Sequence, residues 1–298
     1  MKTSLSELLN SNHTIVADGA MGTMLFALGL KNGESPELWN IEQADKVRSV
    51  HHAYIEAGSQ IVLSNTFGCN RIRLARHHLE DRTVELNAAG ARNARAEADA
   101  APHPVVIAGS IGPTGVMLAP YGDLEFDEAV DIFAEQAQAL IEGGVDVLWI
   151  ETMSALEEVS AAIEGCRRVV PTFPIVTTMT YDTKGRTMMG VTPEKAIQTL
   201  DTLQVVALGA NCGNGPDEIE AVIQKMHTKS PSEVLVAKAN AGLPRMTDTG
   251  PVYDATPETM AHYALRVRDL GARIIGTCCG SNPQHIRAIV HALNTVSP

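Results

Sequence analysis

Short apolar segments rich in β-branched residues recur at eight places along the chain. They read "TIVADGA" (14–20), "QIVLSNTF" (60–67), "VVIAGSIG" (105–112), "DVLWIET" (146–152), "FPIVTTMT" (173–180), "VVALGANC" (205–212), "EVLVAKANAG" (233–242) and "ARIIGTCCG" (272–280). Nearly continuous apolar runs of this length are typical of strands buried on both faces, as in parallel sheets. The pattern therefore predicts eight buried strands.

The segments between these runs carry helical patterns. One apolar stripe has helical spacing and ends at two glycines (143–144), and it comprises Phe126, Val130, Phe133, Ala137, Leu140 and Ile141. Thr-Pro pairs at 192–193 and 256–257, and Asn-Pro at 282–283, predict further helix starts. The alanine-rich stretch 88–101 is interpreted as a solvated helix. Strands and helices thus alternate along the whole chain.

This alternation over 298 residues, without a linker-like stretch, predicts an α/β fold: one (β/α)₈ TIM barrel that forms a single domain over residues 1–298. A net charge of −12 argues against nucleic acid and anionic membranes as partners. No apolar run approaches the ~18 residues that span a bilayer, and the N-terminus lacks a signal-like apolar core. With an odd count of five cysteines, we expect reduced thiols and a cytoplasmic location. The sequence leaves open whether the chain forms a homo-oligomer.

Unusual polar residues stand where the predicted strands end, which is where the active site of such a barrel lies. These residues are Asp18, Gly19, Asn65, Thr66, Ser110, Glu151, Thr152, Asn211, Cys212, Asn240, Cys278 and Cys279. Adjacent cysteines rarely satisfy disulfide geometry. We therefore expect the thiols of the sixth and eighth strand ends to meet at one mouth of the barrel.

Cys212, Cys278 and Cys279 would give a zinc ion three thiolates and one open position, the arrangement of a catalytic site. Alternatively, these cysteines are simply small buried hydrophobic residues. That second interpretation is the one we prefer for Cys69 and Cys166, which fall in helical patterns. The histidine pairs 51–52 and 77–78 are expected on helix surfaces.

The acidic residues have functional and structural interpretations. Asp18 before Gly19 either binds substrate or shapes a turn, and its place at a strand end favours binding. Glu151 follows a fully apolar run, so its burial is costly without a cationic partner such as a substrate ammonium. For Asn65, Ser110, Asn211 and Asn240 the two interpretations are evenly balanced, because such residues often satisfy loop backbone groups.

Seven motifs resemble the homocysteine S-methyltransferase family over nearly the full length of the chain. They are "DGAMGTMLF", "AGSQIVLSNTFG", "AGSIGPTG", "DVLWIET", "GANCGNGPDE", "ANAGLP" and "GTCCGSNPQHI". The family includes betaine–homocysteine methyltransferases and the homocysteine module of cobalamin-dependent methionine synthase. The resemblance implies Zn²⁺ on the three cysteines. It also implies that Asp18, Gly19 and Glu151 hold the amino and carboxyl ends of homocysteine, and that Thr66 lines the pocket.

The chain departs from the family at Thr277, where a second glycine is usual and where a Cβ would crowd the substrate. The resemblance to stand-alone bacterial members, in "PELWN" and "GRTMMGVT", implies glycine betaine as the methyl donor. A quaternary ammonium is recognised over aromatic faces. The candidates are Trp39, Phe67, Tyr121 and Tyr181, with Trp39 preferred.

The donor is the least specified part of the expected reaction. Animal betaine enzymes carry tyrosines where this chain has Gly68 and Thr152. S-methylmethionine, another sulfonium or a methyl-corrinoid protein therefore remain alternative donors. Two further alternatives concern the whole protein: a Schiff-base lyase that uses Lys238, inside the seventh strand, and a noncatalytic barrel with structural zinc.

Overall fold

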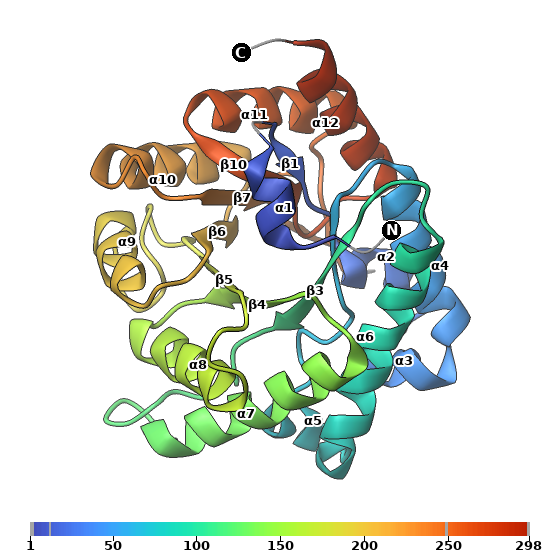
Figure 1. Ribbon diagram of the computed structural model, residues 1–298, viewed down its shortest axis with the longest axis vertical. Helices are drawn as coiled ribbons and strands as arrows, with labels where there is room; N and C mark the ends of the chain where they lie inside the picture. The colour runs from blue at the N-terminus through green and yellow to red at the C-terminus, as the bar shows by residue number, and fades with distance from the viewer. Residues whose placement is uncertain (1–2, 12, 248–249, 297–298) are drawn as a thin grey trace.

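Eight parallel strands form a closed barrel in the computed structural model, which describes residues 3–11, 13–247 and 250–296 (Figure 1). The strands are β1 (Ile15–Val16), β2 (Ile61–Leu63), β3 (Val106–Ile111), β4 (Val147–Met153), β5 (Ile175–Met179), β6 (Ala207–Cys212), β7 (Leu235–Ala239) and β10 (Ala272–Thr277). Their order is β1-β10-β7-β6-β5-β4-β3-β2, and a parallel bridge between Ala17 and Ile61 joins the first strand to the last. The predicted (β/α)₈ barrel is confirmed.

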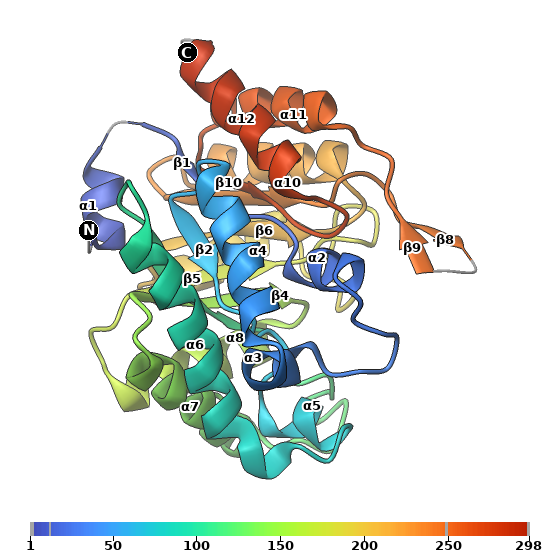
Figure 2. The ribbon, with the colours of Figure 1, turned by 90° about the vertical axis from the view of Figure 1, so that its right-hand side faces the viewer.

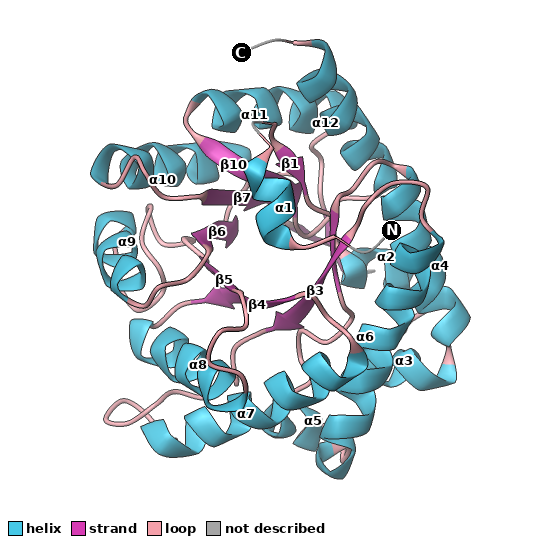
Figure 3. Cartoon of the chain, in the orientation of Figure 1, coloured by secondary structure: helices cyan, strands magenta, loops and turns pink. Residues whose placement is uncertain are grey.

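Helices form a ring around the strands (Figure 3). They are α3 (Trp39–Glu42), α4 (Ala44–Glu56), α5 (Arg71–Ala75), α6 (Thr83–Ala100), α7 (Phe126–Gly143), α8 (Leu156–Val169), α9 (Pro193–Thr202), α10 (Pro216–Lys229), α11 (Pro257–Asp269) and α12 (Pro283–Thr295), with short 3₁₀ turns at Pro36–Leu38 and Glu80–Arg82. Helix α2 (Met21–Ala27) lies in the connection after β1. The predicted helix starts are confirmed: Thr192, Thr256 and Asn282 each cap a helix whose first residue is proline.

One end of the barrel is filled by side chains and the other is open to loops. Trp149 is fully buried in the interior cluster, and Leu5 of helix α1 (Leu5–Asn10) belongs to the same cluster. Helix α1 therefore covers the N-terminal end of the strands. On the opposite side the loops carry α2 and a hairpin of β8 (Arg245–Thr247) and β9 (Gly250–Val252) (Figure 2).

Four expectations about individual segments need correction. The alanine-rich part of α6 is solvated on one face only: Ala96 and Ala100 are exposed, whereas Ala91, Ala94 and Ala98 are buried against neighbouring elements. His51 is fully buried in α4, and burial lowers its pKa to about 4. His77 and His78 lie in a turn after α5 rather than on a helix, and buried Cys69 lies in the loop before α5.

Within the described residues, no helix combines the length and the apolar character needed to cross a membrane.

Candidate functional site

A cavity of about 240 Å³ opens at the C-terminal ends of the strands. Its lining includes most of the residues expected from the sequence: Asp18, Gly19, Asn65, Ser110, Glu151, Thr152, Cys212, Cys278 and Cys279. Lys238, Phe67 and Glu37 line the same cavity. Thr66 does not line it, because its side chain is fully buried and its hydroxyl donates to the Ser110 carbonyl at 2.7 Å.

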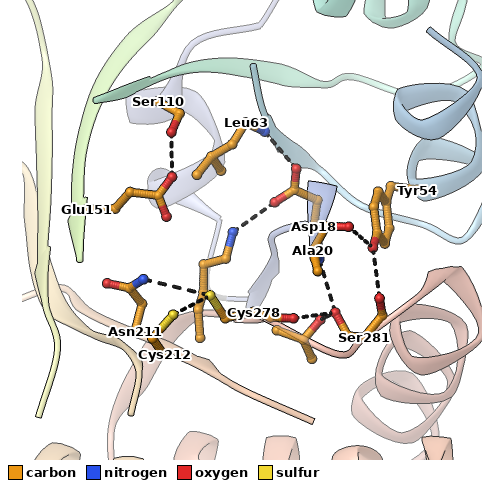
Figure 4. Close-up of polar contacts among 12 residues, drawn as sticks. Asp18, Ala20, Tyr54, Leu63, Ser110, Glu151, Asn211, Cys212, Cys278 and Ser281 are labelled. Carbon is orange, nitrogen blue, oxygen red and sulfur yellow. Dashed lines mark hydrogen bonds and ion pairs between the residues drawn. The ribbon is translucent and has the colours of Figure 1, made fainter. Parts of the chain in front are cut away.

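The three strand-end thiols meet at this cavity. The Sγ of Cys212 lies 2.9 Å from that of Cys278 (Figure 4), and 3.9 Å from that of Cys279. Each of the three cysteines is half-buried, whereas Cys69 and Cys166 are buried elsewhere. Hydrogen bonds from the thiols of Cys212 and then Cys278 lower the pKa of Cys279 to about 3. The cluster thus already favours one thiolate.

Asparagine side chains hold the loops that carry these thiols. Asn240 donates to the Gly213 carbonyl at 2.7 Å and accepts from the Cys279 amide at 3.0 Å, so it ties the two cysteine loops together. Asn211 accepts from the Thr152 amide at 2.9 Å and donates to its hydroxyl at 2.7 Å. The hydrogen bonds that these two asparagines form with backbone groups therefore also hold the site in place.

Two non-glycine residues at the strand ends adopt left-handed backbone conformations. Cys212 has φ 61° and Thr152 has φ 62°. Such conformations are costly for side-chain-bearing residues and persist where the surroundings enforce them, which is often at functional sites. Here the hydrogen bonds of Asn211, the residue before Cys212, tie its strand end to Thr152.

A buried ion pair lies at the base of the cavity. Lys238 Nζ is 2.8 Å from Asp18 Oδ1, and the Leu63 amide donates to Asp18 Oδ2 at 2.7 Å. Both side chains are almost completely buried, with 3% and 4% exposure. Burial acts to lower the pKa of Lys238, but the charges of Asp18 and Glu151 outweigh it and the pKa is raised. Protein groups therefore already contact both Asp18 oxygens.

Glu151 is the carboxylate that remains available. Ser110 Oγ donates to its Oε1 at 2.5 Å, and among the described residues no hydrogen bond reaches Oε2 (Figure 4). Burial raises the pKa of Glu151 to about 7, with Lys238 opposing the shift. A carboxylate buried at this depth is stabilised by a cation, as the sequence analysis anticipated.

The departure at Thr277 is accommodated within the protein. Its hydroxyl donates to Ser281 Oγ at 2.8 Å, and Ser281 Oγ in turn accepts from the Ala20 amide at 3.1 Å. A Cβ on Gly19 would stand 2.5 Å from Ser281 Oγ and 2.8 Å from Thr277 Oγ1. This close approach requires glycine at position 19 and leaves its backbone at the cavity wall.

Of the four aromatic candidates, the structure brings only Phe67 to the cavity. Trp39 lines a separate surface cavity, where Lys46 Nζ lies 4.5 Å from its ring centroid. Tyr121 is 75% exposed on a loop, and Tyr181 is fully buried. Glu37 was missed by the sequence analysis. It belongs to the quoted "PELWN" segment, but only the fold shows that this segment reaches the cavity.

The donor set fits zinc. Three sulfur ligands lie mutually within 4.8 Å on two segments of backbone, the ends of β6 and β10, beside an open cavity. Thiolates are preferred zinc ligands, and three of them leave one position for a substrate. By contrast, the geometry speaks against a Schiff base at Lys238, since that chemistry needs a neutral amine and this ammonium is held by Asp18.

The profile of the "Homocysteine S-methyltransferase" family matches residues 15–293. Methionine synthases from Mycobacterium tuberculosis and Mycobacterium leprae are 32% and 31% identical over 99% and 98% of this chain. The chain spans about a quarter of the length of these relatives.

Among solved structures, the metallated homocysteine methyltransferase MmuM from Escherichia coli is 26% identical and superimposes with a TM-score of 0.79. That likeness covers 96% of this chain and 98% of MmuM. The match of sequence, fold and cysteine cluster establishes that this chain belongs to the homocysteine S-methyltransferase family.

Proposed function

We propose that the protein is a zinc-dependent homocysteine S-methyltransferase that forms methionine, with a small onium compound as its methyl donor. The observation that carries the proposal is the meeting of three thiols with a buried, available carboxylate in one cavity. The thiols suit a metal that activates a substrate thiol, and the carboxylate suits the ammonium of an amino acid. Because the site requires reduced cysteines, the proposal also places the protein in the cytoplasm.

Cys212, Cys278 and Cys279 would hold the zinc ion. When bound, zinc lowers the pKa of a thiol in its open position and so supplies a thiolate nucleophile at neutral pH. Glu151 would accept a hydrogen bond from the substrate ammonium through Oε2, and Ser110 fixes its other oxygen. The backbone at Gly19 lies along the wall beside this group.

Methyl transfer from an onium needs no general acid. The sulfur electron pair of homocysteine forms the new bond to the methyl carbon, and the carbon–nitrogen bond of betaine breaks with its electron pair leaving on nitrogen. The leaving group departs as neutral tertiary amine, and the thiol proton passes to solvent. The side chains therefore act mainly by holding two reactants in line, which can supply about 7–11 kcal/mol of the barrier.

The donor would occupy the outer part of the cavity, between Phe67 and Glu37. The Glu37 carboxylate is fixed by the Gly68 amide at 2.8 Å and by Ser35 Oγ at 2.8 Å. The Arg73 guanidinium lies over one face of the Phe67 ring, with its central carbon 5.2 Å from the ring centroid. A donor cation would therefore take the other face of the ring, where cation–π attraction contributes about 0.5–2 kcal/mol. Glycine betaine is our first candidate, and Phe67 with Glu37 replaces Trp39 as the expected recognition element.

A panel of methyl donors tests the function. Zinc-loaded protein would be incubated with homocysteine and, separately, glycine betaine, S-methylmethionine or methylcobalamin, and methionine would be quantified by mass spectrometry. Methionine from betaine supports the full proposal. Methionine only from S-methylmethionine would reassign the donor, and methionine only from methylcobalamin would favour a corrinoid partner, as the likeness to methionine synthases suggests. No methionine from any donor would contradict the proposed function.

A further inference from the structure

We propose that Lys238 binds the α-carboxylate of the thiol substrate and thereby makes the site selective for amino-acid thiols. The inference deepens the proposed function and rests on it. It also changes the part that Asp18 plays. In place of direct contact with the substrate, Asp18 would position the lysine.

The position of Lys238 is unusual for a strand residue. It lies next to the C-terminal end of β7, paired in register with Asn211 of β6 and Gly276 of β10, and its side chain lines the cavity. Residues on its strand are otherwise apolar, and the lysine is 2% exposed. Burying an ammonium is expensive, so this charge is expected to have both a partner and a use.

The hydrogen-bonding capacity of Lys238 exceeds what the protein uses. An ammonium carries three N–H donors. One donates to Asp18 Oδ1 at 2.8 Å, and among the described residues the other two form no hydrogen bond. The Trp149 ring centroid lies 5.5 Å from Nζ, so one side of the ammonium is covered by an aromatic face. The unused donors remain for a ligand in the cavity.

Lys238 and Glu151 together complement a zwitterion. Glu151 offers one free carboxylate oxygen, and Lys238 offers two free N–H donors in the same cavity. The two groups influence each other electrostatically, since each shifts the pKa of the other. An α-amino acid presents an ammonium and a carboxylate on the same carbon atom, which matches such a pair of opposite charges. A thiol without the carboxylate would leave the Lys238 donors buried and unpaired.

A purely structural role for Lys238 would need fewer N–H donors than the ammonium offers. Neutralising Asp18 requires one N–H, and the second Asp18 oxygen is already paired with the Leu63 amide. A structural lysine of this kind would affect folding but would not distinguish one thiol from another. Substrate selectivity therefore separates the two roles.

The test compares homocysteine with 3-aminopropane-1-thiol, which has the same ammonium and thiol but no carboxylate. Lys238→Gln keeps an N–H that reaches toward Asp18 and removes the charge. We expect this variant to lose about 10- to 100-fold in kcat/KM for homocysteine, mainly through KM, because a charge-assisted hydrogen bond is lost. The loss for the carboxylate-free thiol should be at least tenfold smaller. Calorimetric binding of homocysteine without a donor should weaken by a similar factor.

Lys229→Gln, at the exposed end of α10, is the matched control for loss of one positive charge. If Lys238→Gln does not fold, Asp18→Asn/Lys238→Gln removes both charges of the pair and is measured in the same way. Equal losses for both thiols, or no loss for either, would overturn the inference while wild-type activity upholds the proposed function. Failure of wild-type protein to bind homocysteine would contradict both.

Discussion

Replacing Lys238 with methionine should destabilise the fold strongly, because the change leaves the Asp18 carboxylate buried without its cation. The partners lie 2.8 Å apart and are 3% and 4% exposed, so solvent screens them little. With an effective dielectric constant of about 20, the direct attraction at this distance is roughly 6 kcal/mol. Breaking a buried pair by removing one partner typically costs about 3–5 kcal/mol. We expect Lys238→Met to fall in that range.

The second half of the prediction is recovery in the double variant. Asn at position 18 still accepts the hydrogen bond from the Leu63 amide and carries no charge. Asp18→Asn/Lys238→Met should therefore regain most of the lost free energy of unfolding, as neutral replacements of buried pairs often do.

Urea denaturation followed by circular dichroism measures these differences, with Lys229→Met as the exposed control. The pH dependence has a definite sign. Burial raises the pKa of Asp18, and without the lysine it would rise further. When the pKa of a carboxyl group is higher in the folded state than in the unfolded state, the free energy of unfolding of the protein falls as the pH rises from the unfolded pKa to the folded pKa. The free energy of unfolding that Lys238→Met loses relative to the wild type should consequently be smaller at pH 5 than at pH 7. A deficit below about 1 kcal/mol, or a double variant no more stable than the single one, would refute this account.

Three further predictions concern the site. Cys279→Ala should lose zinc on dialysis and at least 100-fold in activity while remaining folded, whereas Cys166→Ala should keep its zinc; equal metal content by mass spectrometry would contradict the three-thiol site. The pKa of Glu151 is about 7, so homocysteine binding should weaken as pH falls below 7 and this carboxylate protonates; calorimetry of Glu151→Gln should show weaker binding without that pH dependence. Phe67→Ala should raise the donor KM several-fold, and Trp39→Ala should not, because Trp39 lies in a different cavity; the reverse pattern would restore Trp39 as the recognition element.

The sequence predicts the barrel and its reactive end well, since both follow from local patterns. Strand identity comes from apolar runs, and the cysteines at strand ends must face one mouth of a parallel barrel. Contacts between segments that are distant in the sequence are harder to predict from it. The pairing of Asp18 with Lys238 joins residues 220 positions apart. The apolar neighbours of Lys238 indicate that it is buried or catalytic, but they do not identify its partner.

The positions of Trp39 and His51 depend on features that the local pattern does not determine. Trp39 follows a loop whose path is not encoded locally, so residue type alone does not show that it lines a cavity other than that of the thiols. His51 stands on a helix whose inner face had to be assigned from periodicity, and its neighbour His52 is the exposed one of the pair. One residue of helical rotation, about 100°, decides between the two.

Helix α1 closes the end of the barrel opposite the cavity, with Leu5 packed into the interior cluster. In the part of the chain that the structure describes, the cavity therefore opens on the side of the loops that follow the strands. The proposed site places the amino acid at the base of the cavity, beside Lys238 and Glu151, and the donor nearer the opening. This arrangement fixes the order in which substrates bind and products leave. For the proposed reaction we therefore expect the thiol to bind before the methyl donor, and the demethylated donor to leave before methionine. Steady-state kinetics should therefore show a compulsory-order sequential mechanism, with the spent donor released first.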